Sequence, residues 1–253
     1  MRIVVKVGTS TLCDRGVVSI DRMRELCAFL QEIHAKDELI LVTSGAVAAG
    51  HSVVPSLSNK RTPERQALAA VGQAVLMNRY AEMFEPFGIL VAQILITKDD
   101  LANFSRSENA KIAVNTLLAH KILPIINEND TVVIDELLRG DNDQLSAKVT
   151  HYFDGDLLII LSDIDGYYDK NPKTHSDAKL LPIVREIAAE ALEQGATPSD
   201  QFATGGIVTK LKAADFLMKN SKKMFLSSGF DLSFAAQFWR TGSSAHGTLF
   251  SAE

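Results

Sequence analysis

The chain has 253 residues, of which 46% are hydrophobic, and it carries a formal net charge of -5 with a sequence pI near 5.7. This length and composition fit one globular domain with a sizeable core, and the acidic balance argues against a nucleic-acid-binding surface over the whole chain. Cys13 and Cys27 form neither a metal pattern nor a disulfide framework, which favours a reducing compartment. No stretch has the pattern of a signal peptide or the ~18 apolar residues of a membrane span, so we expect a soluble cytoplasmic protein.

Short apolar runs alternate with helical periodicity along the chain. The expected strands cover residues 2–7, 39–42, 89–96, 122–126, 156–161, 223–226 and 248–250. The expected helices cover residues 20–33, 64–84, 106–120, a stretch after residue 206, and 234–238. The second of these helices is expected to carry Leu68, Val71, Val75 and Met83 on one face. The third is expected to carry Ile112, Ala113, Thr116 and Leu117 inward. The alternation predicts a single α/β domain over residues 1–253, with a mainly parallel sheet and helices on both faces.

A loop rich in carboxylates and amides follows the expected strand over residues 122–126. Its polar residues are Asn127, Glu128, Asn129, Asp130, Asp135, Glu136, Asp141, Asn142 and Asp143. The last of these stand just before a helical pattern, so polar groups gather at the C-terminal end of a strand and the N-terminal end of a helix, where open α/β sheets bind ligands. An acidic surface loop with helix-capping Asp and Asn is the alternative.

Two lysines accompany turns that contain glycine. Lys6 lies in an apolar strand just before Gly8, so its ammonium either extends to solvent at a sheet edge or points at an anion above the turn. The turn around Gly45 offers free N–H groups to a phosphate or carboxylate, although a tight turn alone needs the same glycine. The adjacent glycines Gly205 and Gly206 likewise precede a lysine, Lys210. Lysines and Mg²⁺ would offset the repulsion between the acidic loop and ATP, as in phosphoryl-transfer sites.

Signatures of several other enzyme classes are absent from the sequence. It contains no G-x-x-x-x-G-K-[ST], no G-x-G-x-x-G, no H-R-D catalytic loop and no G-x-S-x-G elbow. The six histidines lack metal-ligand spacing, which favours structural or surface positions. Trp239 and the phenylalanines are expected in the core, because no basic pattern interleaves them as in a base-stacking platform.

Seven motifs taken together resemble the amino-acid kinase family, over nearly the whole chain from residue 6 to about 250. They are K-V-G-T-S, V-T-S-G-A-V-A-A-G, A-A-V-G-Q, P-I-I-N-E-N-D, G-D-N-D-Q-L-S-A, L-S-D-I-D-G-Y-Y and A-T-G-G-I-V-T-K. The pair N-E-N-D and G-D-N-D resembles the motifs of those members that phosphorylate the side-chain carboxylate of L-glutamate. That reaction is the first step of proline biosynthesis. The resemblance implies a three-layer αβα sandwich that uses ATP with Mg²⁺ and makes L-glutamyl 5-phosphate.

The resemblance also implies roles for individual residues, position by position. Lys6 and Lys210 would flank the transferred phosphoryl group, and Asp143 would hold both lysines. The residues that resemble the L-glutamate-binding positions are Ser44, Asp130 and Asn142. The residues that resemble nucleotide-binding elements are Lys6, Ser162, Asp163, Thr204, Gly205, Gly206, Ile207, Val208, Thr209 and Lys210. No side chain is assigned as a direct metal ligand.

The chain departs from the family pattern in two places. Ser162 stands where relatives usually have threonine, and since both carry a hydroxyl we expect the nucleotide contact to survive. Many relatives carry an appended C-terminal domain of the PUA type, which we expect this chain to lack, so no nucleic-acid partner is implied. The resemblance further implies feedback inhibition by proline and a homo-oligomer.

Two other functions stay open at this point. A sibling kinase could act on another small carboxylate or on carbamate. A non-catalytic amino-acid or nucleotide sensor could keep the fold, but Lys6, Lys210 and Asp143 count against it because a sensor needs no cations around a transferring phosphoryl group.

Overall fold

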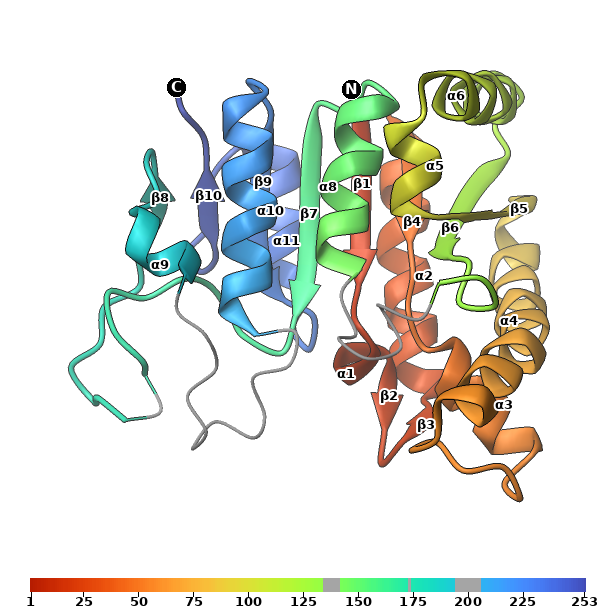
Figure 1. The fold of residues 1–253 in the computed structure, drawn as a ribbon. Coiled ribbons are helices and arrows are strands. Elements are labelled where there is room, and N and C mark those ends of the chain that lie inside the picture. Colours follow the sequence, from red (N-terminus) through yellow and green to blue (C-terminus); the bar gives the residue numbers. More distant parts are fainter. Residues whose placement is uncertain (134–141, 173, 194–205) are drawn as a thin grey trace.

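Figure 1 shows the computed structural model, which describes residues 1–133, 142–172, 174–193 and 206–253. The strands are β1 (Arg2–Val7), β2 (Cys13–Asp14), β3 (Val17–Val18), β4 (Glu38–Val42), β5 (Val91–Ile96), β6 (Leu123–Glu128), β7 (Leu157–Ser162), β8 (Ile183–Val184), β9 (Lys223–Ser228) and β10 (Thr248–Phe250). The helices are α1 (Thr9–Leu12), α2 (Ile20–His34), α3 (Ala46–Val53), α4 (Thr62–Phe84), α5 (Lys98–Ala102), α6 (Phe104–Ala119), α8 (Asn142–Tyr152), α9 (Ala189–Glu193), α10 (Ile207–Lys219) and α11 (Ser233–Thr241), with a short 3-10 turn at Glu85–Phe87. None of the described helices is long and apolar enough to cross a membrane.

Eight strands form one sheet in the order β5-β6-β4-β1-β7-β9-β10-β8, and β2 and β3 form a separate hairpin. Neighbouring strands of the large sheet pair in parallel except β9 and β10, which are antiparallel. The C-terminal ends of β1, β4, β6, β7 and β9 therefore lie at one edge of the sheet. In parallel α/β sheets this edge carries the ligand sites, and here it gathers the turns that the sequence singled out.

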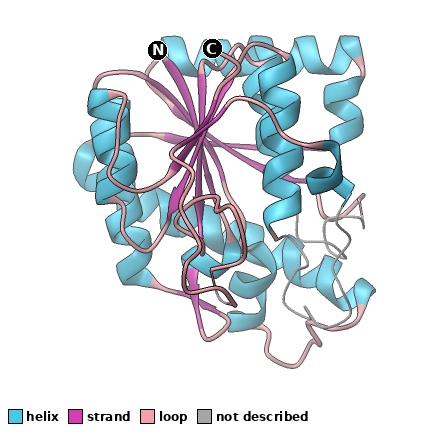
Figure 2. Cartoon of the chain, turned by 90° about the vertical axis from the view of Figure 1, so that its left-hand side faces the viewer, coloured by secondary structure: helices cyan, strands magenta, loops and turns pink. Residues whose placement is uncertain are grey.

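Helices cover both faces of this sheet, as the end-on view in Figure 2 shows. One buried cluster joins the sheet to α2, α4 and α11, and a second joins it to α5, α6, α8 and α10. Within β1, Ile3 and Val5 belong to the first cluster and Val4 to the second. Because side chains alternate along a strand, Lys6 shares the face of Val4 and points toward α8 and α10. The predicted three-layer αβα sandwich is confirmed.

The inward face expected for residues 106–120 is wrong, whereas the face expected for residues 64–84 is buried at Leu68 and packs against the core at Val75 and Met83 but not at Val71. Ile112 of α6 is 62% exposed and Val71 of α4 is 39% exposed. The buried residues of α6 are Ser107, Val114 and Leu118. This helix packs against α5 and β6, so only the stripe that faces them is covered, and side-chain polarity alone does not locate that stripe.

Helices α3 and α4 touch backbone to backbone at two glycines. A Cβ atom on Gly72 would lie 1.8 Å from the carbonyl oxygen of Ala46, and one on Gly50 would lie 2.0 Å from that of Leu68. The turn that starts α3 has Gly45 at φ 98°, a left-handed conformation that favours glycine. The glycine of the A-A-V-G-Q motif therefore sets where α3 and its N-terminal turn lie.

Gly72→Ala is expected to lower the free energy of unfolding by about 3 kcal/mol, because no rotamer change relieves a clash between Cβ and backbone. The helix-propensity gain of at most about 1 kcal/mol is smaller. Urea denaturation followed by circular dichroism measures the difference. Ala70→Ser, at an exposed position of the same helix, is the control and should stay close to the unsubstituted chain. A Gly72→Ala protein as stable as this control would contradict the packing argument.

Candidate active site

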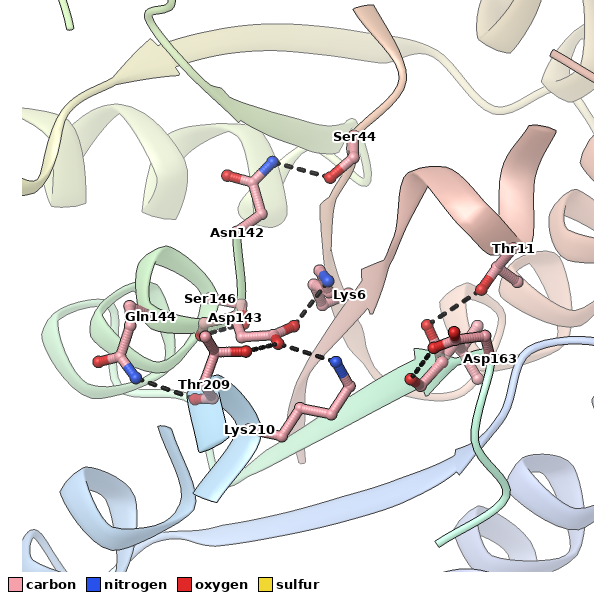
Figure 3. A network of polar contacts seen from close by, with 12 residues as sticks. Lys6, Thr11, Ser44, Asn142, Asp143, Gln144, Ser146, Asp163, Thr209 and Lys210 are labelled. Atoms are coloured by element: carbon pink, nitrogen blue, oxygen red, sulfur yellow. Dashed lines mark hydrogen bonds and ion pairs between the residues drawn. The ribbon is translucent and has the colours of Figure 1, made fainter. Parts of the chain in front are cut away.

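A buried carboxylate holds two lysines at the C-terminal edge of the sheet. Asp143, in the first turn of α8, places Oδ1 2.6 Å from Lys6 Nζ and Oδ2 3.0 Å from Lys210 Nζ. Each of these three side chains is at most 7% exposed. Thr209 Oγ1 also donates to Oδ2 at 2.8 Å. Figure 3 shows how β1, α8 and α10 converge here, so the structure brings together the three residues expected to carry catalysis.

The cluster contains two basic side chains and one acidic side chain. Burial opposes ionisation of Asp143, but the nearby charges of Lys6 and Lys210 outweigh it and hold the pKa of this carboxyl well below its ordinary value. Asp143 therefore stays ionised, and the two lysines leave one net positive charge on the three groups. Fixed cations of this kind stabilise the negative charge of a transferring phosphoryl group.

The start of α10 is anchored on α8. Thr209 Oγ1 also lies 2.9 Å from the carbonyl oxygen of Gly206, and Gln144 Nε2 donates to the carbonyl oxygen of Thr209 at 3.0 Å. Ile207 packs against the second core cluster, and Val208 is half-buried. These contacts fix the position from which Lys210 reaches Asp143. Of the sequence expectations, those for Thr204, Gly205, Asp135, Glu136 and Asp141 lie outside the described residues.

Ser162 and Asp163 lie where β7 ends, beside β1 and β9. Ser162 is buried, and its Oγ lies 3.1 Å from Asp163 Oδ1, while its carbonyl oxygen accepts a 2.7 Å hydrogen bond from Gly229 N. The residue Asp163 is exposed (Figure 3). Thr11 Oγ1 donates to the carbonyl oxygen of Leu161, the residue before Ser162, at 3.5 Å. The expected nucleotide contacts therefore share the edge that holds Lys6.

Asn142 ties the Ser44 turn to the end of β6. Its Nδ2 donates to the carbonyl oxygen of Thr43 at 2.7 Å, to Ser44 Oγ at 3.0 Å and to Asn127 Oδ1 at 2.9 Å. Asn127 Nδ2 in turn donates to Gln73 Oε1 on α4 at 2.9 Å. Asn142 itself is fully buried behind Ser44. Because Asp143 follows it directly, this network connects the Ser44 turn to the two lysines.

A cavity of about 260 Å³ opens beside this network. It is lined by Ser44, Arg65, Asn127 and Asp130 among others, but not by Asn142. Burial, followed by the neighbouring charge of Glu128, raises the pKa of Asp130 to about 7, although Arg65 opposes the shift. A second hollow of about 470 Å³ lies at the opposite edge of the sheet and contains none of these residues.

Sequence reasoning missed two residues at this site. Gln73 orients Asn127, and Arg65 lines the cavity. The A-A-V-G-Q motif contained a signal for Gln73, while a lone arginine near a helix start gave none for Arg65. Within the described ranges, no group of three or more His, Cys, Asp or Glu side chains is arranged to hold a metal ion.

Comparison with known proteins decides the family. Residues 1–227 match the model described as the amino acid kinase family. The chain belongs to this family. A glutamate 5-kinase of Wolinella succinogenes is 52% identical over 98% of this chain and 97% of its own length, and one of Leishmania donovani is 49% identical over 98% and 94%. Within the amino acid kinases the chain therefore groups with the glutamate 5-kinases, which confirms the resemblance drawn from the motifs.

Solved structures agree with this placement at the level of the fold. The crystal structure of UMP kinase from Bacillus anthracis superposes with a TM-score of 0.66 over 100% of this chain and 96% of its own, at 14% identity. An identity this low shows the amino acid kinase fold alone. The fold described above is therefore similar to that of the UMP kinase over nearly the whole of both chains.

Proposed function

We propose that this chain transfers the γ-phosphoryl group of ATP to the side-chain carboxylate of L-glutamate, giving L-glutamyl 5-phosphate and ADP in the first step of proline biosynthesis. The observation that carries the proposal is the buried cluster of Lys6, Asp143 and Lys210 beside a cavity that contains Asp130. The choice of L-glutamate is supported by relatives of matching length that are named glutamate 5-kinase.

The reaction needs alignment and charge compensation more than proton transfer. A γ-carboxylate oxygen forms a bond to the γ-phosphorus while the bond from that phosphorus to the bridging oxygen of ADP breaks. The attacking carboxylate is already ionised near pH 7, so no general base is required. Lys6 and Lys210, held by Asp143, reduce the repulsion between the two anions and stabilise the equatorial oxygens of the phosphoryl group.

The nucleotide is assigned to the end of β7 and the start of α10. Ser162 and Asp163 at the first, and Gly206 to Lys210 at the second, bring ATP to the same edge as Lys6. Thr204 and Gly205, outside the described residues, are assigned to the nucleotide from the motif alone. Mg²⁺ is assigned to the ATP phosphates, whose charge it neutralises. We assign it no ligand among the described residues, and an ion carried by phosphates and water needs no protein cage.

The cavity is assigned to the amino acid. Asp130 pairs with the α-ammonium of L-glutamate, and Ser44 meets the substrate at the N-terminal turn of α3. Asn142 does not line the cavity but positions Ser44, because its amide donates to Ser44 Oγ and to the carbonyl oxygen of Thr43. The amino-acid pocket and the catalytic lysines are thus joined through consecutive residues, Asn142 and Asp143.

The kcat/KM for L-glutamate is expected to fall about tenfold per pH unit once the pH drops below the Asp130 pKa of about 7, since only the carboxylate form pairs with the α-ammonium. At saturating glutamate kcat should change less, because the bound ammonium stabilises the charged carboxylate. Asp130→Asn should raise the KM for L-glutamate more than about tenfold and flatten the profile. A rise in the KM for ATP with an unchanged KM for L-glutamate would mean that the cavity containing Asp130 binds the nucleotide and not the amino acid.

Proline is proposed to compete with L-glutamate for this cavity. It carries an α-carboxylate and a secondary ammonium at matching positions, so the same charged side chains suit it. The apparent KM for L-glutamate should rise with proline concentration. An unchanged apparent KM at high proline would remove this assignment.

A homo-oligomer is proposed through the apolar surface of β5 and α6. Leu95, Phe104 and Ile112 are 41%, 82% and 62% exposed there, at the edge strand of the sheet. Light scattering on the purified chain should give a mass of at least twice 27.6 kDa. A monomer at micromolar concentration would contradict the assignment.

Trapping the acyl phosphate with hydroxylamine tests the function. Reactions contain MgATP and, separately, L-glutamate, N-acetylglutamate, aspartate or carbamate. The expected result is hydroxamate from L-glutamate alone. Product from another acid only would move the chain to a sibling activity, and no product from any acid would support a sensor.

A further inference from the structure

Arg65 lines the same cavity as Ser44, Asn127 and Asp130, but it comes from a different element of the fold. It belongs to the first turns of α4, whereas Asn127 and Asp130 stand at the end of β6 and Ser44 follows β4. The cavity wall therefore carries an arginine as well as the carboxylate of Asp130.

The guanidinium of Arg65 is held in place, but its charge is not neutralised by contact. Arg65 NH1 donates to the carbonyl oxygen of Asn59 at 3.2 Å, and Nε has no hydrogen-bond partner among the described residues. No carboxylate of the described part of the chain lies within 4.0 Å of the guanidinium nitrogens. A partly buried arginine with unused donors next to a cavity suits an anionic ligand group, above all a planar carboxylate.

The same cavity also carries negative charge. Asp130 lines it, and Glu128, 2% exposed, lies close enough to influence that carboxyl electrostatically, as does Arg65. Asp130 and Arg65 are thus electrostatic neighbours that do not form an ion pair. An α-amino acid head group presents one ammonium and one carboxylate on the same carbon, and separated charges of opposite sign are complementary to it.

Building on the function proposed above, we propose that Arg65 binds the α-carboxylate of the amino-acid substrate while Asp130 binds its α-ammonium. Held at both charges, the head group leaves only the side chain free to reach the Ser44–Gly45 turn and the lysines beyond it. Arg65 is then a specificity-determining residue. Because Arg65 holds the α-carboxylate, the enzyme selects a second carboxylate that is separated from the first by three carbons. Acids that lack an α-carboxylate are disfavoured.

The test compares two ligands that differ only at the α-carboxylate, L-glutamate and L-isoglutamine, in which that group is a neutral amide. Hydroxamate formation with MgATP gives kcat and KM, and where L-isoglutamine is not turned over its inhibition constant against L-glutamate replaces KM. Arg65→Gln is expected to raise the KM for L-glutamate about 10- to 100-fold with a smaller change in kcat. The same substitution should change the L-isoglutamine constant less than about threefold, and Arg65→Lys should recover part of the L-glutamate affinity.

Arg61→Gln is the matched control, because Arg61 precedes α4, is 75% exposed and pairs with Glu64 at the surface. It should leave both ligands unchanged. Equal losses for the two ligands in Arg65→Gln, or an unchanged KM for L-glutamate, would overturn the proposal. The unsubstituted enzyme tests the proposed function separately. Hydroxamate formed from L-glutamate by this enzyme supports the proposed function whatever the effect of Arg65→Gln. No hydroxamate from this enzyme would reject the proposed function.

Discussion

Replacing Lys210 by alanine is expected to lower kcat about a hundred- to a thousandfold, the usual loss when one group that stabilises transition-state charge is removed. The KM for L-glutamate should change much less, because Lys210 pairs with Asp143 and is not among the residues that line the amino-acid cavity. Lys6 and Thr209 still hold Asp143 in this variant, so the fold should persist. Steady-state kinetics with circular dichroism at matched concentrations measures both quantities.

Lys212→Ala is the control for this variant. Lys212 lies on the same helix, two residues further on, and its side chain is exposed. Its loss should leave kcat within about twofold, as for surface substitutions in general. A folded Lys210→Ala enzyme with near-normal turnover would remove Lys210 from the mechanism.

Asp143→Asn is expected to abolish measurable turnover and to destabilise the fold. The substitution leaves the ammonium groups of Lys6 and Lys210 buried without the carboxylate that both contact. Removing one partner from a buried ion pair costs about 3 to 5 kcal/mol, so a clear fall in the unfolding midpoint should accompany the loss of kcat. Thermal denaturation and kinetics on the same preparation separate the two effects.

The pH dependence of stability gives a second reading of Asp143. Its pKa in the folded chain lies below the ordinary value, so its stabilising contribution is present above about pH 4 and is lost as the pH falls toward the folded pKa. The stability difference between the unsubstituted chain and Asp143→Asn should therefore shrink on acidification. A difference that stayed constant down to pH 3 would mean that Asp143 does not stabilise the fold as a charged partner of the lysines.

Local sequence was sufficient where one pattern had one structural solution. The strand over residues 2–7 and the closing strand over residues 248–250 match β1 and β10. The inward face of α6 was wrong because Ile112 is apolar yet sits at the uncovered side of an edge helix, 62% exposed. Which face is covered depends on neighbours that are far away in sequence.

The candidate site divides in the same way. Lys6 could be singled out because a charge inside an apolar strand is conspicuous, and the structure pairs it with Asp143. The A-A-V-G-Q motif held a signal for Gln73 but not for its contact, and Arg65 had no signal at all, since a polar residue on a helix is ordinarily expected at the solvent face. Only packing of α4 against β6 and α3 shows that they reach Asn127 and the cavity.

In the proposed reaction a phosphoryl group moves from ATP to the γ-carboxylate of L-glutamate at the Lys6–Asp143–Lys210 cluster. L-glutamate labelled with ¹⁸O in that carboxylate tests it most directly. In L-glutamyl 5-phosphate the oxygen between carbon and phosphorus comes from the label, and attack of the α-amine on C5 closes a lactam and releases phosphate that keeps this oxygen. Phosphorus NMR should therefore show inorganic phosphate carrying one ¹⁸O, with Lys210→Ala as the blank. Phosphate without ¹⁸O would mean that water or another acceptor takes the phosphoryl group, and would contradict the account.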